Sequence, residues 1–377
     1  MIQKKIKTKG KVYVGMSGGV DSSVSAALLQ KAGYEVTGVF MKVWQPDFLP
    51  CTWREERLDA MRVAAKLGIP LLTWDFEKEY KEGVADYMIA EYKAGRTPNP
   101  DVMCNREVKF GAFFRRAIAE GADFVATGHY ARVVESSLRP RRKSADSKSK
   151  VKSEYKMLKG IDDTKDQSYF LWTLGQGELS KTFFPIGEYK KSAVRALAKK
   201  FDLPVAEKKD SQGLCFVGKL DMKDFLAHFI KEKEGSVLSE KNEVIGTHRG
   251  VSFYTLGERH GFTVTKKGTD DAPLYVTAKD FNANTITVAP LLKNGLQCAS
   301  QTLQASQARF CRGVLPDTKK KYTAQVRYHG EQYKCKISQQ SVASMKLHFE
   351  KPAVFDAGQS VVLYDGNECL GGGIIDL

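Results

Sequence analysis

The chain has 377 residues, of which 42% are hydrophobic, and Lys plus Arg outnumber Asp plus Glu by 59 to 44. This length predicts two or three domains, because one core rarely grows beyond about 250 to 300 residues, and the net charge of +15 makes nucleic acid a candidate partner beside the alternative of a basic metabolic enzyme. The sequence lacks both the roughly 18 consecutive apolar residues of a membrane helix and the apolar core of a signal peptide, which predicts a cytoplasmic protein with no membrane contact.

The first half of the chain alternates short apolar runs with helical patterns. Strands are predicted at residues 12–14, 35–41, 71–74 and 123–127, and helices at residues 20–33, 54–67, 77–93 and 105–119. In the second of these helices, Leu58, Met61 and Ala65 follow the helical period. The alternation predicts an α/β fold with a doubly wound parallel sheet, whose ligands bind at the carboxyl ends of the strands. The glycine-containing loop at residues 15–23, Met41 and Gly128 all lie at the carboxyl ends of predicted strands.

The second half changes character. Residues 136–153 contain seven Lys or Arg against one Asp and predict a solvated surface insertion, with a dedicated RNA contact as the alternative. From about residue 246 the pattern changes to short segments such as 285–288, 322–328 and 360–364, the last followed by the hairpin signal Asp365-Gly366 and a run at 369–375. We therefore predict a domain over 1–223, a small central domain of unassigned class over 224–287 and a C-terminal β-barrel over 288–377.

Residues 15–23, GMSGGVDSS, join the first predicted strand to the first predicted helix. Gly18 and Gly19 allow the backbone to approach a ligand closely, and the N–H groups of a helix N-terminus suit phosphate. The loop contains no lysine, which excludes a Walker A loop. It matches the pyrophosphatase-type loop, or PP-loop, of adenylating enzymes, which holds the pyrophosphate end of ATP together with Mg²⁺ while the α phosphorus is attacked. The alternative is a Gly-Ser turn without a ligand.

Two cysteines lie in polar loops. Cys104 precedes the helix predicted from Asn105 and is followed by basic residues, so its thiol is a candidate thiolate, and Asp101 could exchange protons with a heterocycle. Cys215 lies in the lysine-rich segment EKKDSQGLCFVG, and a pair of thiols allows sulfur transfer followed by resolution through a disulfide. The alternative for either is an inert buried thiol. The other cysteines are predicted to be structural: Cys51, Cys298, Cys311, Cys335 and Cys369.

Seven cysteines, an odd number, do not fit a secreted disulfide framework. No pair has C-x-x-C spacing, and the six histidines are scattered, so we predict no zinc or other protein-bound metal site.

Eight blocks spread over nearly the whole chain resemble the tRNA-specific 2-thiouridylases of the MnmA/TrmU type. These blocks are GMSGGVDSSVSAALL, FMKVW, AGRTPNPDVMCNREVKF, ATGHYAR, KDQSYFLWTL, FFPIGEYKK, KKDSQGLCFVG and YTLGERHGF. The resemblance implies a PP-loop sulfurtransferase that uses ATP to adenylate the 2-oxygen of the wobble uridine of tRNA and replaces that oxygen with persulfide sulfur. It also implies tRNAs for Lys, Glu and Gln as substrates, and a persulfide donor such as a cysteine desulfurase or a sulfur-relay protein.

The resemblance assigns roles by matching positions. It implies that Cys215 carries the persulfide, that Cys104 attacks it or closes a disulfide, and that Asp101 is a general acid or base. It implies an ATP site of Gly15, Met16, Ser17, Gly18, Gly19, Val20, Asp21 and Ser22, with Met41 and Gly128 beside the adenosine. It implies tRNA contacts from Asn99, Pro100, Asp101, His129, Lys165, Asp166, Gln167, Arg327, Tyr328 and Gln359.

Two departures from the family pattern stand out: Gln212 replaces a threonine of many relatives, and the basic insertion is longer than expected. Two rival functions remain. One is another adenylating PP-loop enzyme, such as a lysidine, argininosuccinate or amide-forming synthetase, which would have no use for Cys104 and Cys215. The other is a non-catalytic RNA-binding protein that has kept a glycine loop.

Overall fold

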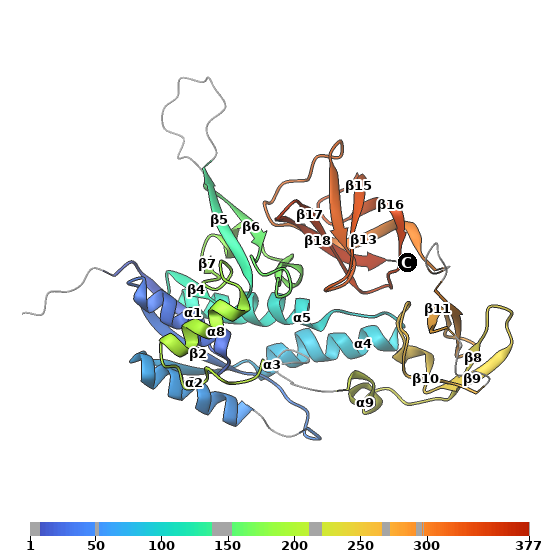
Figure 1. The fold of residues 1–377 in the computed structure, drawn as a ribbon, viewed down its shortest axis with the longest axis horizontal. Helices are drawn as coiled ribbons and strands as arrows, with labels where there is room; N and C mark the ends of the chain where they lie inside the picture. The colour runs from blue at the N-terminus through green and yellow to red at the C-terminus, as the bar shows by residue number, and fades with distance from the viewer. Residues whose placement is uncertain are drawn as a thin grey trace, which may run out of the picture.

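The protein is built of three parts, shown in Figure 1: an α/β part, a C-terminal barrel above it and a smaller β part beside both. The structure is a computed structural model that describes residues 8–49, 53–137, 153–210, 221–265, 272–291, 296 and 298–376. Within these residues, none of the helices has the length and apolar character needed to cross a membrane.

A parallel five-stranded sheet forms the centre of the α/β part. Its strands are β1 (Lys11–Gly15), β2 (Glu35–Lys42), β3 (Leu71–Asp75), β4 (Phe124–Ala126) and β7 (Thr182–Phe183), in the order β3-β2-β1-β4-β7. All the pairings are parallel, and Val14 of β1 lies between Gly38 and Ala126. The predicted doubly wound α/β fold is confirmed.

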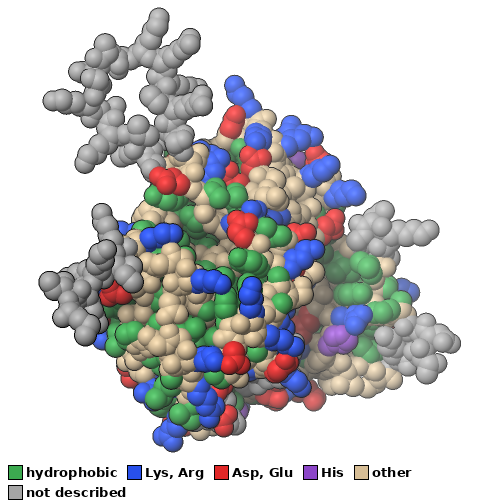
Figure 2. Space-filling model, turned by 60° about the vertical axis from the view of Figure 1, so that its left-hand side comes forward, with side chains coloured by type: hydrophobic (Ala, Val, Ile, Leu, Met, Phe, Trp, Pro, Cys, Tyr) green, Lys and Arg blue, Asp and Glu red, His purple; other side chains and the backbone are tan. Residues whose placement is uncertain are grey.

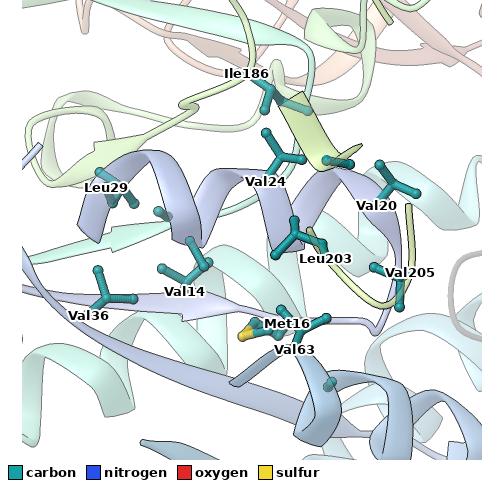
Figure 3. Packing of buried hydrophobic residues seen from close by; sticks show 14 of the residues in the cluster. Val14, Met16, Val20, Val24, Leu29, Val36, Val63, Ile186, Leu203 and Val205 are labelled. Carbon is teal, nitrogen blue, oxygen red and sulfur yellow. The ribbon is translucent and has the colours of Figure 1, made fainter. Parts of the chain in front are cut away.

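The core of this part lies between the sheet and helices α1 (Val20–Lys31), α2 (Trp53–Leu67) and α8 (Lys191–Lys200). Val12 and Val14 are completely buried, and burial of such a side chain contributes roughly 1.5–3 kcal/mol. Figure 3 shows Val14 of β1 and Val24 of α1 in the same cluster as Ile186. This packing fixes the N-terminus of α1 at the carboxyl edge of the sheet.

Helix α2 is where predicted, but the apolar residues that mark its helical period do not face the core. Leu58 and Met61 are 47% and 42% exposed, whereas Ala60, Val63 and Ala64 are buried. Both sets follow the helical period. The small side chains face inward because α2 packs close to the glycine loop: a Cβ at Gly18 would lie 2.2 Å from the carbonyl oxygen of Glu56.

Two long helical stretches contain π-helical turns. The first consists of α3 (Glu77–Tyr80), η1 (Lys81–Asp86) and α4 (Tyr87–Lys93), and the second of α5 (Pro100–Met103), η2 (Cys104–Phe113) and α6 (Phe114–Ala119). The second begins five residues before its predicted start at Asn105. Pro100 occupies the first helical position, where its missing N–H costs nothing, and the Asn99 side chain accepts a hydrogen bond from Val102 N at 3.1 Å.

A hairpin of β5 (Ala131–Ser137) and β6 (Ser153–Lys159) joins the α/β part to the barrel. Its strands pair along their whole length, and β6 also pairs with barrel strand β18 through Met157 and Cys369. Residues 138–152 of the predicted basic insertion lie outside the described residues. The short helices η3 (Ser168–Leu171) and α7 (Gln176–Leu179) follow the hairpin.

The central part contains a second five-stranded sheet. After α9 (Met222–Ala227), its elements are β8 (Gly235–Leu238), β9 (Val244–His248), η4 (Val251–Phe253), β10 (Phe262–Val264), β11 (Leu274–Asp280) and β12 (Thr285–Pro290), with strand order β10-β9-β8-β12-β11. Its core includes Met88 and Ile89 of α4, so the central part packs on the α/β part. Strand β12 runs through residues 287 and 288, between which we predicted a domain division.

The C-terminal part is the predicted β-barrel. Its strands are β13 (Ser300–Phe310), β14 (Lys321–Gln325), β15 (Gln332–Gln340), β16 (Met345–Ala353), β17 (Ser360–Asp365) and β18 (Glu368–Asp376). They follow the order β13-β16-β15-β14-β17-β18, and pairing of β13 with β18 closes the barrel. The predicted Asp365-Gly366 hairpin joins β17 to β18, with Gly366 at φ 58°.

Candidate active site

A cavity of about 590 Å³ lies where the carboxyl ends of β1, β2 and β4 face the barrel. Most of the predicted ATP residues line it: Gly15, Ser17, Gly19, Val20, Asp21, Ser22, Met41 and Gly128. The other two, Met16 and Gly18, support the loop: Met16 is buried in the core, and Gly18 adopts a φ of 70° against α2. The cavity therefore brings the predicted ATP residues from three separate stretches of sequence together.

The glycine loop is held open by its own hydrogen bonds. Ser17 N donates to Ser22 Oγ at 3.3 Å, and Ser23 Oγ donates to the Gly19 carbonyl at 2.7 Å. Gly19, at the N-cap of α1, has no side chain that could cap the helix. The first N–H groups of α1 are thus available for an anion in the cavity.

Gly128 is required by close packing rather than by its dihedral angles. A Cβ there would lie 2.7 Å from Ser22 N and 2.8 Å from the carbonyl carbon of Asp21. Met41 packs similarly against Gly15, where a Cβ would lie 2.9 Å from the methyl carbon of Met41. These contacts set the distance between the glycine loop, which is the candidate phosphate loop, and the adjacent strand ends.

A lysine that the sequence analysis missed completes the loop. Lys191, at the start of α8, places Nζ 2.8 Å from both carboxylate oxygens of Asp21 and 2.9 Å from Asp210 Oδ1. Tyr130 also donates its hydroxyl to Asp21 Oδ1 at 2.8 Å. The only sequence signal was the block FFPIGEYKK, whose last residue is Lys191. The lysine is therefore supplied from 170 residues further along the chain.

Asp210 gathers cations at the same wall of the cavity. Lys165 lies 3.1 Å and Arg195 2.6 Å from its carboxylate. Burial raises the pKa of Asp210, but hydrogen bonds from Lys191 and Lys165 outweigh it and lower the pKa to about 2. The carboxylate is ionised at neutral pH and keeps Lys191 and Lys165 beside the phosphate loop.

Asp101 and Cys104 lie close together in the chain but differ in exposure. Asp101 lines the cavity, as do Asn105 and Lys109 on the following turns. Cys104 has no exposed surface and packs in the cluster that includes Met41. Our expectation that Cys104 lies at a helix N-terminus is wrong, because the helix starts at Pro100.

Cys215 and Gln212 lie outside the described residues. The last described residue before this segment, Asp210, lines the same cavity as Asp101.

The predicted tRNA residues fall into two groups. Those lining the cavity are Asp101, His129, Lys165, Gln167 and Tyr328. Among the described residues, the others lie outside its lining: Asn99, Pro100, Asp166, Arg327 and Gln359.

Several of these side chains have partners within the protein. Asp166 accepts hydrogen bonds from Gly160 N at 2.9 Å and Ser168 Oγ at 2.8 Å. Arg327 donates to the Val354 carbonyl at 3.2 Å. His129 is buried with Nδ1 2.7 Å from Thr127 Oγ1, and burial, assisted by Lys109, holds its pKa well below the usual value, so the ring is neutral at pH 7.

An aromatic group forms the barrel side of the cavity. Tyr328 packs between Phe170 and His329, with ring centroids 4.2 Å and 4.0 Å away, and all three line the cavity. Burial, with the charges of Asp166 and Asp101, raises the pKa of Tyr328 to about 12. Phe170 and His329 were not predicted; the block KDQSYFLWTL, which contains Phe170, was the available signal.

The fold and the cavity define a protein with a PP-loop nucleotide site faced by a β-barrel. Residues 10–219 match a family model described as tRNA methyl transferase HUP domain, residues 223–290 its PRC-barrel domain, and residues 300–375 an aminomethyltransferase beta-barrel domain. The order of these models along the chain agrees with the three parts in Figure 1.

The curated relatives specify the family. The tRNA-specific 2-thiouridylase MnmA of Geobacillus thermodenitrificans is 44% identical and covers 97% of this chain and 94% of its own length. That of Thiobacillus denitrificans is 43% identical, over 97% and 99%. The chain belongs to the tRNA-specific 2-thiouridylase family. A solved NMN synthetase from Francisella tularensis is 20% identical, covers 58% of this chain and 72% of its own, and has a TM-score of 0.31.

Proposed function

We propose that this protein thiolates the wobble uridine of tRNA. ATP adenylates the C2 oxygen, and sulfur from a cysteine persulfide then replaces that oxygen, which yields 2-thiouridine, AMP and pyrophosphate. Family membership supports this proposal. The single structural observation that carries it is one cavity lined by the phosphate loop, by Asp101 and by aromatic side chains of the barrel.

ATP fits the phosphate loop with its pyrophosphate end at the N-terminus of α1. Lys191 and Lys165 stand at the same wall, where they would stabilise the charge that develops on departing pyrophosphate. The loop needs no lysine of its own because α8 provides one. Met41 and Gly128 would then lie beside the adenosine, as the family resemblance implies.

Mg²⁺ would accompany the nucleotide. No three His, Cys, Asp or Glu side chains of the described residues form a group that could hold a metal by themselves. Mg²⁺ keeps several waters and needs only one or two carboxylates beside phosphate oxygens, and Asp21 and Asp210 both line the cavity and fit this demand. When bound, the ion would neutralise charge on the phosphates.

The target base would enter between Asp101 and the aromatic group of Tyr328. Unstacking a base from the anticodon loop costs a few kcal/mol, roughly what stacking on one aromatic side chain returns. Asp101 would then move the uridine proton, with Asn99 and Pro100 shaping the approach and His129, Lys165, Asp166, Gln167, Arg327 and Gln359 contacting or supporting tRNA.

Sulfur would arrive as a persulfide on Cys215. In one route the Cys104 thiolate attacks the inner sulfur and displaces sulfide, which attacks C2 and expels AMP. In the other the terminal persulfide sulfur attacks C2 and expels AMP, and the Cys104 thiolate then attacks the Cys215 sulfur and displaces the thiolated base. Both routes end in a Cys104–Cys215 disulfide, which a thiol reductant must reduce. Because Cys104 is buried, either route requires that tRNA binding uncover its thiol.

The test is nucleoside mass spectrometry of tRNA after incubation with protein, ATP, Mg²⁺ and a persulfide donor. We expect 2-thiouridine and tRNA-dependent pyrophosphate release. Cys104→Ser and Cys215→Ser should each abolish thiolation and leave tRNA affinity unchanged, while Cys298→Ser, outside the cavity lining, should behave as wild type. Full turnover by the double Cys→Ser variant would favour a sulfur-free adenylating enzyme, and tRNA binding without pyrophosphate release a non-catalytic binder.

The remaining expectations stay proposals. They are substrate tRNAs for Lys, Glu and Gln, a cysteine desulfurase or sulfur-relay protein as donor, action in the cytoplasm, and a division into domains near 1–223, 224–287 and 288–377.

A further inference from the structure

All three parts of the protein meet at one buried ion pair. Lys279, on β11 of the central part, places Nζ 2.5 Å from Asp356 Oδ2, in the barrel turn between β16 and β17. The two side chains are 7% and 0% exposed. Lys279 Nζ also donates to the Gly95 carbonyl at 3.2 Å, in the connection between α4 and α5.

The α4–α5 connection is also bonded to the barrel. Thr97 Oγ1 donates to Asp356 Oδ2 at 3.2 Å, and Thr97 N donates to the Ala357 carbonyl at 2.7 Å. One carboxylate thus holds a lysine of the central part and a hydroxyl of the α/β part together.

Steric contacts enclose the same connection from both sides. Gly95 has a φ of 80°, and a Cβ there would lie 2.4 Å from the Phe281 ring of the central part. Gly358 of the barrel has a φ of 86°, and a Cβ there would lie 3.1 Å from both backbone N and O of Thr97. Residues 95–97 therefore lie between Phe281 of the central part and Gly358 of the barrel, and neither contact leaves room for an added Cβ atom.

The block YTLGERHGF, to which no role has been assigned, supplies the rest of this junction. Leu256 N donates to Asp356 Oδ2 at 3.1 Å, and the Tyr254 carbonyl accepts from Lys279 Nζ at 3.3 Å. The hydroxyls of Thr255 and Thr97 are 3.0 Å apart. This block thus connects the central part to the turn that precedes the candidate active site.

The junction leads in one direction to Asp101 and in the other to the barrel's proposed tRNA contacts. Asn99, two residues after Thr97, caps α5, whose second residue is Asp101. On the barrel side, Asp356 N donates to the Gln359 side chain at 3.2 Å. We propose that Lys279 and Asp356 are positioning residues. Their ion pair fixes the start of α5, which carries Asp101, relative to the surface of the barrel that is proposed to contact tRNA. This inference rests on the proposed function.

The pair's expected effect is on alignment more than on stability. Replacing both charges of a buried pair is often neutral for stability, whereas removing one leaves an uncompensated charge. Misplacing reacting groups by about 1 Å can cost about 100-fold in rate. Loss of the pair should therefore slow the chemical step even where the fold recovers.

The experiment compares Lys279→Met, Asp356→Asn and the double variant with wild type. The control is Lys321→Met, which removes an exposed barrel pair, Lys321 with Glu350 at 2.7 Å. The measurements are the thermal midpoint, tRNA affinity by filter binding, and the single-turnover rate of 2-thiouridine formation. We expect the double variant to recover most of the midpoint lost by the single variants, with wild-type tRNA affinity and a thiolation rate lowered by at least about 10-fold.

The outcomes separate this inference from the function on which it rests. A thiolation rate that follows the thermal midpoint across the variants, or that matches wild type in the double variant, would show that the pair is only structural and overturn the inference. Wild-type protein that forms no 2-thiouridine would overturn the proposed function and this inference with it. The control should match wild type in all three measurements.

Discussion

Two residues far apart in the sequence, Lys191 and Asp21, meet at the proposed phosphate site, and the contribution of Lys191 can be measured. Removing the Lys191 ammonium would leave the carboxylates of Asp21 and Asp210 facing the phosphates without the cation between them. We expect Lys191→Met to lower kcat/KM for tRNA-dependent pyrophosphate release by about 100-fold, the usual effect of losing one charge-stabilising donor. Lys199→Met is the matched control, because Lys199 lies on the same helix in an exposed pair with Glu207. Equal losses in both variants would contradict this role.

A second residue-scale prediction concerns Gly128. Alanine at this position would force a Cβ to within 2.7 Å of Ser22 N, so the phosphate loop must shift. Gly128→Ala should weaken ATP binding by at least about 10-fold and lower the free energy of unfolding by about 1–3 kcal/mol, as overpacking does. Gly177→Ala is the control, because among the described residues a Cβ there would have no atom within 4 Å apart from its chain neighbours and the backbone of its own helix. Calorimetric ATP titration and thermal unfolding test both, and unchanged ATP affinity in Gly128→Ala would refute the packing argument.

A third residue-scale prediction concerns His129 and the pH dependence of the free energy of unfolding. Its pKa in the folded protein lies well below the ordinary value near 6.5, because burial and Lys109 disfavour the charged ring. Above pH 6.5 neither the folded nor the unfolded protein binds a proton at His129, so this residue does not make the free energy of unfolding depend on pH. Below it only the unfolded chain binds the proton, so the free energy of unfolding falls, by up to about 1.4 kcal/mol per pH unit, until the folded pKa is reached. In His129→Gln, the free energy of unfolding measured with urea should change less between pH 7 and 5.5 than in wild type. The control is His348→Gln, at an exposed ring, which should not have this effect.

At the scale of elements, the sequence predicted β1 to β4 and the long helices between them, but only four of the fourteen later strands among the described residues, and not how the elements meet. The apolar runs that became β1 to β4 are short and continuous, as buried parallel strands require. The sequence could not decide which side of α2 faces the core, because two sets of apolar residues follow the same helical period. The close approach of Gly18 to the backbone of α2 selects the set with small side chains. Lys191 could not be assigned because its contact with Asp21 spans 170 residues and no local pattern encodes it. The start of α5 was the exception: Asn99-Pro100 is a local cap-and-proline signal that could have been recognised.

The β5–β6 hairpin gives a prediction at this scale. Its register continues to Ser137 opposite Ser153, so its strands are fully paired without residues 138–152. Replacing these residues with Asn-Gly, which suits a two-residue hairpin turn, should leave the thermal midpoint unchanged. If the seven Lys and Arg of the insertion are only solvated, the salt dependence of tRNA binding should also stay the same. If the insertion instead binds the tRNA backbone, its removal should reduce the salt slope by about 1 for each phosphate that it neutralises, which would assign it an RNA role.

At the scale of the whole molecule, the positive charge on the face shown in Figure 2 is spread over many side chains. The chain carries a net charge of +15, and Figure 2 shows Lys and Arg side chains spread over the visible face among fewer Asp and Glu side chains. We expect such a surface to attract the tRNA backbone without reading its sequence, and the cavity between the α/β part and the barrel to select the base. On this hypothesis, affinity and specificity come from different parts of the protein.

This separation predicts how salt acts. Each phosphate neutralised by Lys or Arg releases condensed counterions, so log affinity should fall linearly with log salt, and about six to ten contacts would weaken tRNA binding by about 10³- to 10⁵-fold between 50 and 200 mM. The single-turnover thiolation rate at saturating tRNA should change far less, because Asp101 and Tyr328 act in a cavity partly shielded from bulk ions. Filter binding and rapid-quench thiolation over one salt series test both statements. A flat binding response would contradict the electrostatic account, and a saturated rate that falls as steeply as the affinity would show that backbone contacts also align the base.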